Sequence, residues 1–88
     1  MESIMMTDKS GTKRWYNTKG DLHREDGPAV ENVYGTKIWY INGKKHREDG
    51  SAIEWYYGAK DWFLDGEKYT EAQYKQKMRL KKINELYK

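Results

Sequence analysis

The chain is 88 residues long, contains no cysteine and carries a formal net charge of +3. This length fits one domain near the lower size limit for independent folding, and the absence of thiols excludes disulfides, thiolate metal sites and cysteine nucleophiles. Apolar residues make up only 36%, but 15% of the chain is aromatic, so rings are expected to supply most of the buried apolar surface.

Residues 1–10 are predicted to form a tail or a short edge strand. They include acidic residues and no long apolar run, which argues against a secretory signal. No segment reaches the roughly 18 apolar residues of a membrane span. We therefore expect a soluble, cytoplasmic protein without a membrane partner.

Residues 11–69 contain a repeat with a period of 23 to 24 residues. Its units begin with GTKRWY, GTKIWY and GAKDWF at Gly11, Gly35 and Gly58. The segments HREDGPA and HREDGSA, which begin at His23 and His46, lie between them. A repeat of this kind indicates that one supersecondary unit is used several times.

Each unit is predicted to consist of short antiparallel strands. Residues 37–41, KIWYI, are β-branched and aromatic, as is typical of strands. Asn42-Gly43 follows them, and Asp65-Gly66 takes the same place in the third unit. Both dipeptides favour a tight hairpin turn, since the two central residues of a type I′ turn need positive φ.

Residues 70–88 are predicted to form a helix that begins with a capping box of Thr70 and Gln73. Helical periodicity places Tyr74 and Met78 nearly opposite the main apolar stripe. We expect that stripe to cover part of the sheet; its residues are Ala72, Leu80, Ile83, Leu86 and Tyr87.

The predicted fold is therefore a single domain over residues 1–88, mainly β with one C-terminal α-helix. Tandem antiparallel β-hairpin repeats form a single-layer twisted sheet, and the amphipathic helix caps it.

The units, with the pattern W-Y-x-N-G-K-x-H-R-x-D-G-x-A, resemble MORN repeats, which form consecutive β-hairpins. They are more similar to small phage and bacterial proteins with HREDGPA-type units, which close with a hairpin and a short helix near a TE motif. Here WFLDGEKYTE, from Trp62 to Glu71, corresponds to that closing segment. The resemblance covers roughly residues 11–74. It implies a hairpin fold and a viral origin, with the host cytoplasm as location, and it implies no shared activity.

The segment from His23 to Asp26 has two interpretations: an acid–base pair beside an anion-binding arginine, or a structural turn. The same residues recur at His46 to Asp49, whereas a catalytic site needs one asymmetric constellation, and no nucleophile accompanies them. We favour the turn. We predict no catalytic residues, no metal site and no cofactor.

The aromatic residues of the strands also have two interpretations. They either form cross-strand pairs that stabilise the sheet or remain exposed as an interface, because one helix cannot cover both faces. The predicted partner-binding residues are Tyr16, Arg24, Tyr40, Arg47, Trp55 and Tyr56.

The C-terminal segment is basic, with six basic and two acidic residues after Thr70. It is either a solvated helix face or a site for nucleic-acid phosphates. Its predicted basic surface consists of Lys75, Lys77, Arg79, Lys81 and Lys82.

Open sheet edges also make a homodimer an expected alternative.

We therefore expect a small phage-encoded protein, not an enzyme, that inhibits a host protein or protein complex by occupancy. A component of a bacterial defence system is the expected target, which includes an anti-CRISPR role. The alternatives are a nucleic-acid-binding accessory protein that uses the basic helix and a protein that sequesters nucleotide signals.

Overall fold

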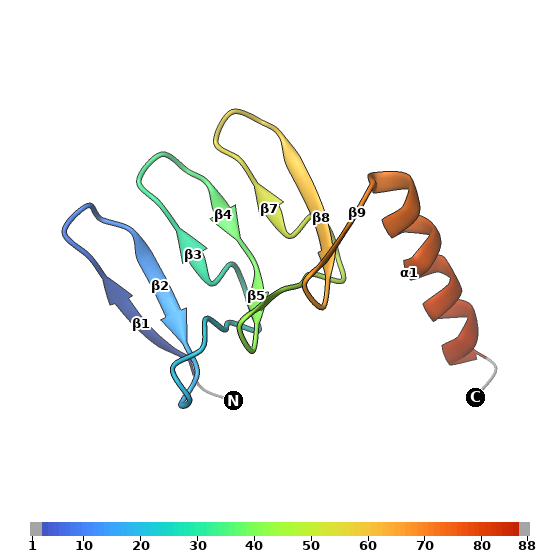
Figure 1. Ribbon diagram of the computed structural model, residues 1–88, viewed down its shortest axis with the longest axis horizontal. Coiled ribbons are helices and arrows are strands. Elements are labelled where there is room, and N and C mark those ends of the chain that lie inside the picture. Colours follow the sequence, from blue (N-terminus) through green and yellow to red (C-terminus); the bar gives the residue numbers. More distant parts are fainter. Residues whose placement is uncertain (1–2, 87–88) are drawn as a thin grey trace.

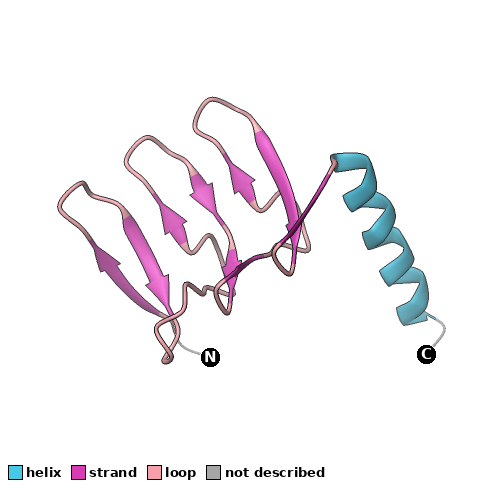
Figure 2. Cartoon of the chain, in the orientation of Figure 1, coloured by secondary structure: helices cyan, strands magenta, loops and turns pink. Residues whose placement is uncertain are grey.

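The computed structural model describes residues 3–86 and shows an open antiparallel sheet followed by one helix (Figures 1 and 2). The sheet has seven strands in the order β1-β2-β3-β4-β7-β8-β9, and β5 and β6 form a separate hairpin. The strands are β1 (Ile4–Thr7), β2 (Lys13–Tyr16), β3 (Val30–Glu31), β4 (Lys37–Ile38), β5 (Tyr40–Ile41), β6 (Lys44–Lys45), β7 (Ile53–Glu54), β8 (Lys60–Leu64) and β9 (Glu67–Tyr69), and the helix is α1 (Glu71–Leu86). The predicted mainly β fold with one C-terminal helix is confirmed.

Three hairpins, β1–β2, β3–β4 and β7–β8, lie side by side with their loops at the same end of the molecule (Figure 1). All neighbouring strands are antiparallel. The helix α1 stands at the end of the row that is farthest from β1 (Figure 1). The molecule is accordingly elongated and measures 47 × 31 × 17 Å.

Polar side chains set the hairpin loops. The Oδ1 atom of Asn32 accepts hydrogen bonds from the backbone N–H groups of Tyr34 and Thr36, both at 3.0 Å. Asp8 holds the first loop in the same way, because its Oδ1 accepts from the N–H groups of Ser10 and Thr12. Short Asn and Asp side chains favour such turns because they reach the backbone two residues ahead.

The second kind of turn is formed by the two dipeptides that the sequence predicted as hairpin turns. Asn42 and Gly43 have φ values of 49° and 82°, and Asp65 and Gly66 have φ values of 51° and 85°. Positive φ at both positions is what a type I′ turn requires. The hairpin predictions at these two sites are confirmed.

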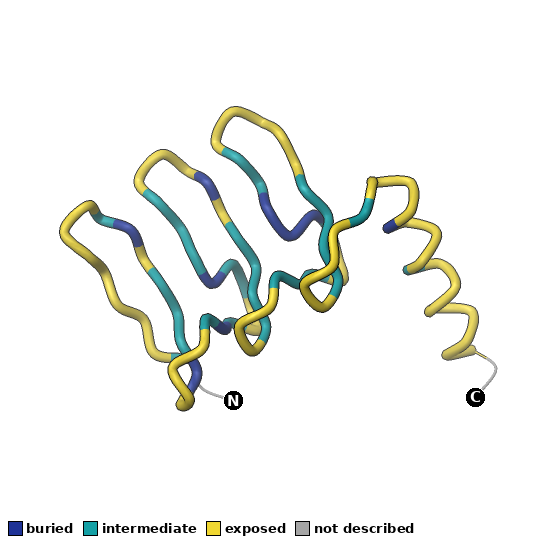
Figure 3. The backbone as a smooth tube through the Cα atoms, viewed as in Figure 1, coloured by how far each residue is buried: buried dark blue, intermediate teal, exposed yellow. Residues whose placement is uncertain are grey.

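The buried core is small and is spread along the hairpins (Figure 3). Ala29 and Ala52 have no exposed surface, and Ile53 is also buried. Each alanine bonds to the strands on both sides; for example, Ala29 N–H donates to Ile38 O at 2.8 Å and Ala29 O accepts from Trp15 N–H at 2.8 Å. The alanines therefore extend the ladder of backbone hydrogen bonds between consecutive units.

The helix begins with the predicted capping box. Thr70 N–H donates to Gln73 Oε1 at 3.0 Å, and Gln73 N–H donates to Thr70 Oγ1 at 3.1 Å. The predicted contact face is wrong, however. Tyr74 is buried and Met78 is half-buried, and the residues of the stripe that was expected to pack on the sheet are exposed: Ala72, Leu80, Ile83 and Leu86. Tyr87 of that stripe lies outside the described residues.

The reason for this difference is the contact that Tyr74 makes. Its ring lies 4.9 Å from the ring of Trp62 on β8, measured between centroids. This aromatic contact in the first turn of α1 determines which face of the helix meets the sheet. The apolar periodicity averaged over the whole helix gives no sign of a single contact of this kind.

Candidate interaction surfaces

The first HREDG segment forms a corner built around Arg24. The guanidinium carbon of Arg24 lies 3.9 Å from the ring centroid of Trp15. Nε donates to Asp26 Oδ1 at 3.1 Å, and Nη1 donates to Pro28 O at 3.1 Å and to Glu31 Oε2 at 3.2 Å. These contacts combine cation–π stacking with charge-assisted hydrogen bonds. Arg24 therefore holds its own corner together.

The second corner repeats this arrangement around Arg47. The guanidinium carbon of Arg47 lies 3.7 Å from the ring centroid of Trp39. Nε donates to Asp49 Oδ1 at 2.8 Å, and Nη1 donates to Ser51 O at 3.0 Å and to Glu54 Oε2 at 2.8 Å. The two arginines that the sequence suggested for partner binding are half-buried and engaged within the chain.

The third unit replaces the arginine with Tyr74 of α1. Its ring covers Trp62 as the guanidinium groups cover Trp15 and Trp39. The Tyr74 hydroxyl donates to Arg47 O at 2.6 Å and accepts from Gly50 N–H at 3.3 Å. Burial raises the pKa of Tyr74 above its usual value. The helix thus closes the repeat by satisfying the backbone of the second corner.

Each histidine of the corners binds the turn of the following unit. His23 Nδ1 accepts a hydrogen bond from Asn42 N–H at 2.9 Å, and His46 Nδ1 accepts from Asp65 N–H at 3.0 Å. An accepting Nδ1 places the proton of the neutral ring on Nε2. That nitrogen lies 3.4 Å from Glu25 in the first corner and 3.1 Å from Glu48 in the second. The geometry supports the interpretation of HREDG as a structural turn.

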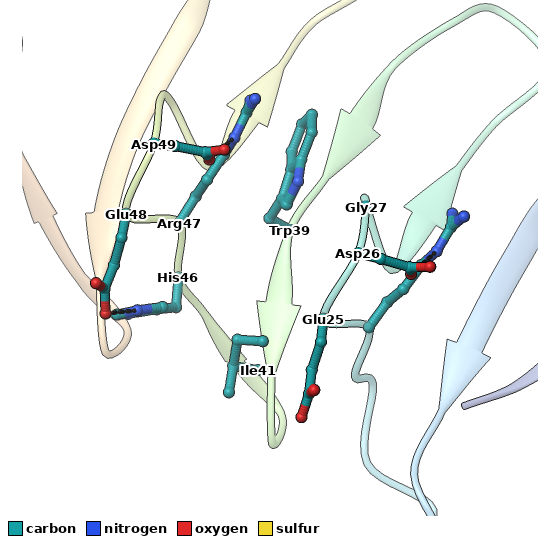
Figure 4. Close-up of a pocket in the computed structure, with 10 residues that line it drawn as sticks. Glu25, Asp26, Gly27, Trp39, Ile41, His46, Arg47, Glu48 and Asp49 are labelled. Atoms are coloured by element: carbon teal, nitrogen blue, oxygen red, sulfur yellow. Dashed lines mark hydrogen bonds and ion pairs between the residues drawn. The ribbon is translucent and has the colours of Figure 1, made fainter. Parts of the chain in front are cut away.

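A groove of about 800 Å³ lies between the two corners (Figure 4). Trp39 and Ile41 lie between the walls, and each wall carries two carboxylates (Figure 4). Asp26 and Asp49 are largely exposed. They also bind the arginine of their own corner, so their charge is partly compensated.

The basic side chains of α1 are partly paired within the chain. Lys81 Nζ lies 2.7 Å from Glu48 Oε1, and Lys75 Nζ lies 2.8 Å from Glu71 Oε2. The hydrogen bond from Lys81 is the main reason why the pKa of Glu48 is lowered. Among the described residues, the other three members of the predicted basic surface are not paired in this way. The ammonium group of Lys77 lies over the ring of Tyr69, and Arg79 and Lys82 are exposed.

Exposed rings gather at the loops of the second and third hairpins. Tyr34, Tyr56 and Tyr57 are 75%, 63% and 65% exposed. Tyr56 lies 6.0 Å from Tyr34 and 5.2 Å from Tyr57 between ring centroids, and Trp55 stacks on Tyr57 at 6.0 Å. We call these four residues the aromatic cluster.

The aromatic cluster coincides only in part with the predicted binding residues. Tyr56 is exposed as predicted, whereas Tyr16, Tyr40 and Trp55 are half-buried. Sequence analysis missed Tyr34 and Tyr57. Each of these tyrosines directly precedes the glycine of its loop, Gly35 or Gly58, and that position at a loop tip is the signal that could have identified them.

Within residues 3–86, no three His, Asp or Glu side chains converge in a way that could hold a metal ion. None of the described residues belongs to a helix with the length and apolar character needed to cross a membrane. No family model, curated protein or solved structure matches the chain.

Proposed function

We propose that this chain is a non-catalytic binding protein that engages a protein partner through the aromatic cluster. The exposure of three adjacent tyrosines carries this proposal. Tyrosine and tryptophan are enriched at protein interfaces, where they contribute much of the binding energy. In the monomer these rings contact one another, yet more than half of the surface of each tyrosine remains exposed to a partner.

The hydrogen bonds of the cluster support a binding role, because a rigid surface loses little entropy on binding. Tyr56 N–H donates to Thr36 Oγ1 at 3.1 Å, which joins the second and third loops. Trp55 Nε1–H donates to Asp61 Oδ2 at 2.7 Å. The rings are thus presented by loops that are already held in place.

The proposed target is a host protein, with components of bacterial defence systems first among them. This part of the proposal rests on the resemblance of the repeats to small phage proteins. Inhibition would follow from occupancy of the target surface in the host cytoplasm. The histidine and arginine side chains of the corners, the residues most suited to chemistry, are engaged in structural contacts.

The two other functions are less well supported. Binding of nucleic-acid phosphates would use the positive charge of α1, and the pairing of Lys75 and Lys81 with acids reduces that charge. Sequestration of a nucleotide would need available arginines, and Arg24 and Arg47 already donate to backbone carbonyls and carboxylates.

Affinity capture from bacterial lysate tests the proposal. The immobilised wild-type chain should retain a stoichiometric protein, and the variant Tyr34→Ser/Tyr56→Ser/Tyr57→Ser should lose it. The matched control is Leu80→Ser/Ile83→Ser/Leu86→Ser, which removes three exposed apolar side chains from α1 and should retain the partner. Capture of nucleic acid that is released by salt would favour the nucleic-acid function. Equal capture of the protein partner by both variants would exclude the aromatic cluster as its binding site.

A further inference from the structure

The two edges of the sheet differ in how they are covered. At one edge, β9 is followed directly by α1, and Lys77 of the helix lies over Tyr69 of β9. At the other edge, β1 pairs with β2 on one side, and no segment within residues 3–86 pairs with its other side. Among the described residues, the seven-stranded sheet therefore has an open edge at β1 that a further strand can extend.

The side chains of β1 are suited to contact with another strand. All four residues are exposed, and the exposed fractions of Ile4, Met5 and Met6 are 58%, 45% and 63%. Natural proteins protect open edges with charges, prolines or bulges. The segment from Ile4 to Thr7 has neither a charged residue nor a proline. It carries no feature that would prevent pairing with an identical strand.

The hydrogen bonds of neighbouring residues indicate which backbone groups of β1 face the open edge. Trp15 N–H donates to Ala29 O, which directly precedes β3, and therefore points away from β1. Asp8 N–H donates to Thr12 O across the first loop. Alternate residues of an antiparallel strand bond to opposite sides. Ile4 and Met6 therefore bond to β2, and Met5 and Thr7 present their N–H and C=O groups to the open edge.

We propose that β1 pairs with β1 of a second copy of this chain, antiparallel about a two-fold axis at Met6. In this register Met5 of one copy and Thr7 of the other exchange hydrogen bonds in both directions. The two Met6 side chains meet across the axis at a non-hydrogen-bonded pair, where side chains approach most closely. The two sheets then form one continuous sheet.

Symmetry limits this assembly to a dimer. The contact is isologous, because the same strand contributes from both copies. At the opposite end of this sheet, β9 is followed by α1, which stands at that end of the row (Figure 1), so the pairing uses only the open edge at β1. The aromatic cluster lies on the loops outside β1, so the dimer presents two copies of it and does not depend on it.

Two variants of β1 test the proposal by different means. Met5→Pro removes an N–H that points to the open edge and leaves the bonds between β1 and β2 intact, and proline is tolerated at edge positions of this kind. Met6→Lys keeps the backbone and places two like charges on the axis. Val33→Lys is the control, because Val33 is also an exposed apolar residue, 58% exposed, but lies in the second hairpin loop.

Sedimentation velocity over a range of protein concentrations provides the measurement. The wild type and Val33→Lys should approach twice the chain mass of 10.6 kDa. Both β1 variants should raise the dimer dissociation constant about ten-fold or more, while the far-UV spectrum remains that of the wild type. A monomeric wild type at all concentrations would overturn the proposal. A dimer that survives both β1 variants, or that is lost in the tyrosine variant instead, would also overturn it.

Discussion

His23 Nδ1 accepts a hydrogen bond from the backbone N–H of Asn42 at 2.9 Å, although the two residues belong to consecutive units. The same bond joins His46 to Asp65, again 19 residues apart. Each histidine therefore fixes the turn of the unit that follows it. In repeat proteins such contacts between neighbours supply most of the stability, because a single repeat cannot bury enough surface by itself.

The first prediction concerns this bond. His23→Leu should lower the free energy of unfolding by about 2 kcal/mol, because the Asn42 N–H loses its acceptor inside the protein. Urea denaturation measures the effect. His46→Leu is the matched comparison. Its side chain is 16% exposed, against 2% for His23, so water can reach the Asp65 N–H and the loss should be smaller. Equal losses in both variants would contradict this explanation.

The second prediction separates the shape of the arginine side chain from its charge. Arg47→Lys keeps the charge but loses the planar contact with Trp39 and part of the hydrogen bonding. It should cost about 1–2 kcal/mol in unfolding free energy, measured by thermal denaturation. Arg14→Lys is the control, since Arg14 forms an exposed pair with Asp8 and should change stability by about 0.5 kcal/mol or less.

Much of the fold follows from local features of the sequence. The period places the hairpins, Asn42-Gly43 and Asp65-Gly66 set two turns, and Thr70 with Gln73 starts the helix. Each of these signals acts over a few residues, where steric limits and short-range hydrogen bonds determine the conformation. They are therefore visible in a single sequence.

The parts that the sequence did not predict depend on contacts between units. The repeat shows that His and Asn-Gly recur, but not that one binds the other across 19 residues. The contact of Tyr74 with Trp62 reversed the expected face of α1 for the same reason. The exposure of Tyr34 depends on which side chains of the neighbouring loop cover it. Such contacts are properties of the folded arrangement.

The third prediction tests how α1 closes the repeat. Tyr74→Phe keeps the ring on Trp62 but removes the hydroxyl that donates to Arg47 O and accepts from Gly50 N–H. The loss should be about 1–2 kcal/mol, with faster hydrogen exchange at the Gly50 amide. Tyr69→Phe removes an exposed hydroxyl bound to Glu67 and should leave that amide unchanged. Unchanged exchange in Tyr74→Phe would show that the hydroxyl does not hold the corner.

The last prediction concerns the effect of acid on the first loop. The pKa of Asp8 lies well below its usual value of 3.8, mainly because the Ser10 hydroxyl and then Arg14 donate hydrogen bonds to the carboxylate. A carboxyl whose pKa is lower in the folded state stabilises the protein above its unfolded pKa, and this contribution is lost as the pH falls toward the folded value.

Asp8→Asn should therefore be less stable than the wild type at neutral pH, and the difference should shrink as the pH falls below 3.8. The side-chain amide oxygen of the new asparagine can still accept hydrogen bonds from Ser10 and Thr12. Asn32 accepts the corresponding bonds from Tyr34 and Thr36 in the second loop. Asp8→Ala loses those bonds as well and should remain less stable than Asp8→Asn at every pH. Denaturation curves recorded along a pH series measure both differences. A gap between wild type and Asp8→Asn that stays constant down to the lowest pH would show that the charge of Asp8 does not stabilise the loop.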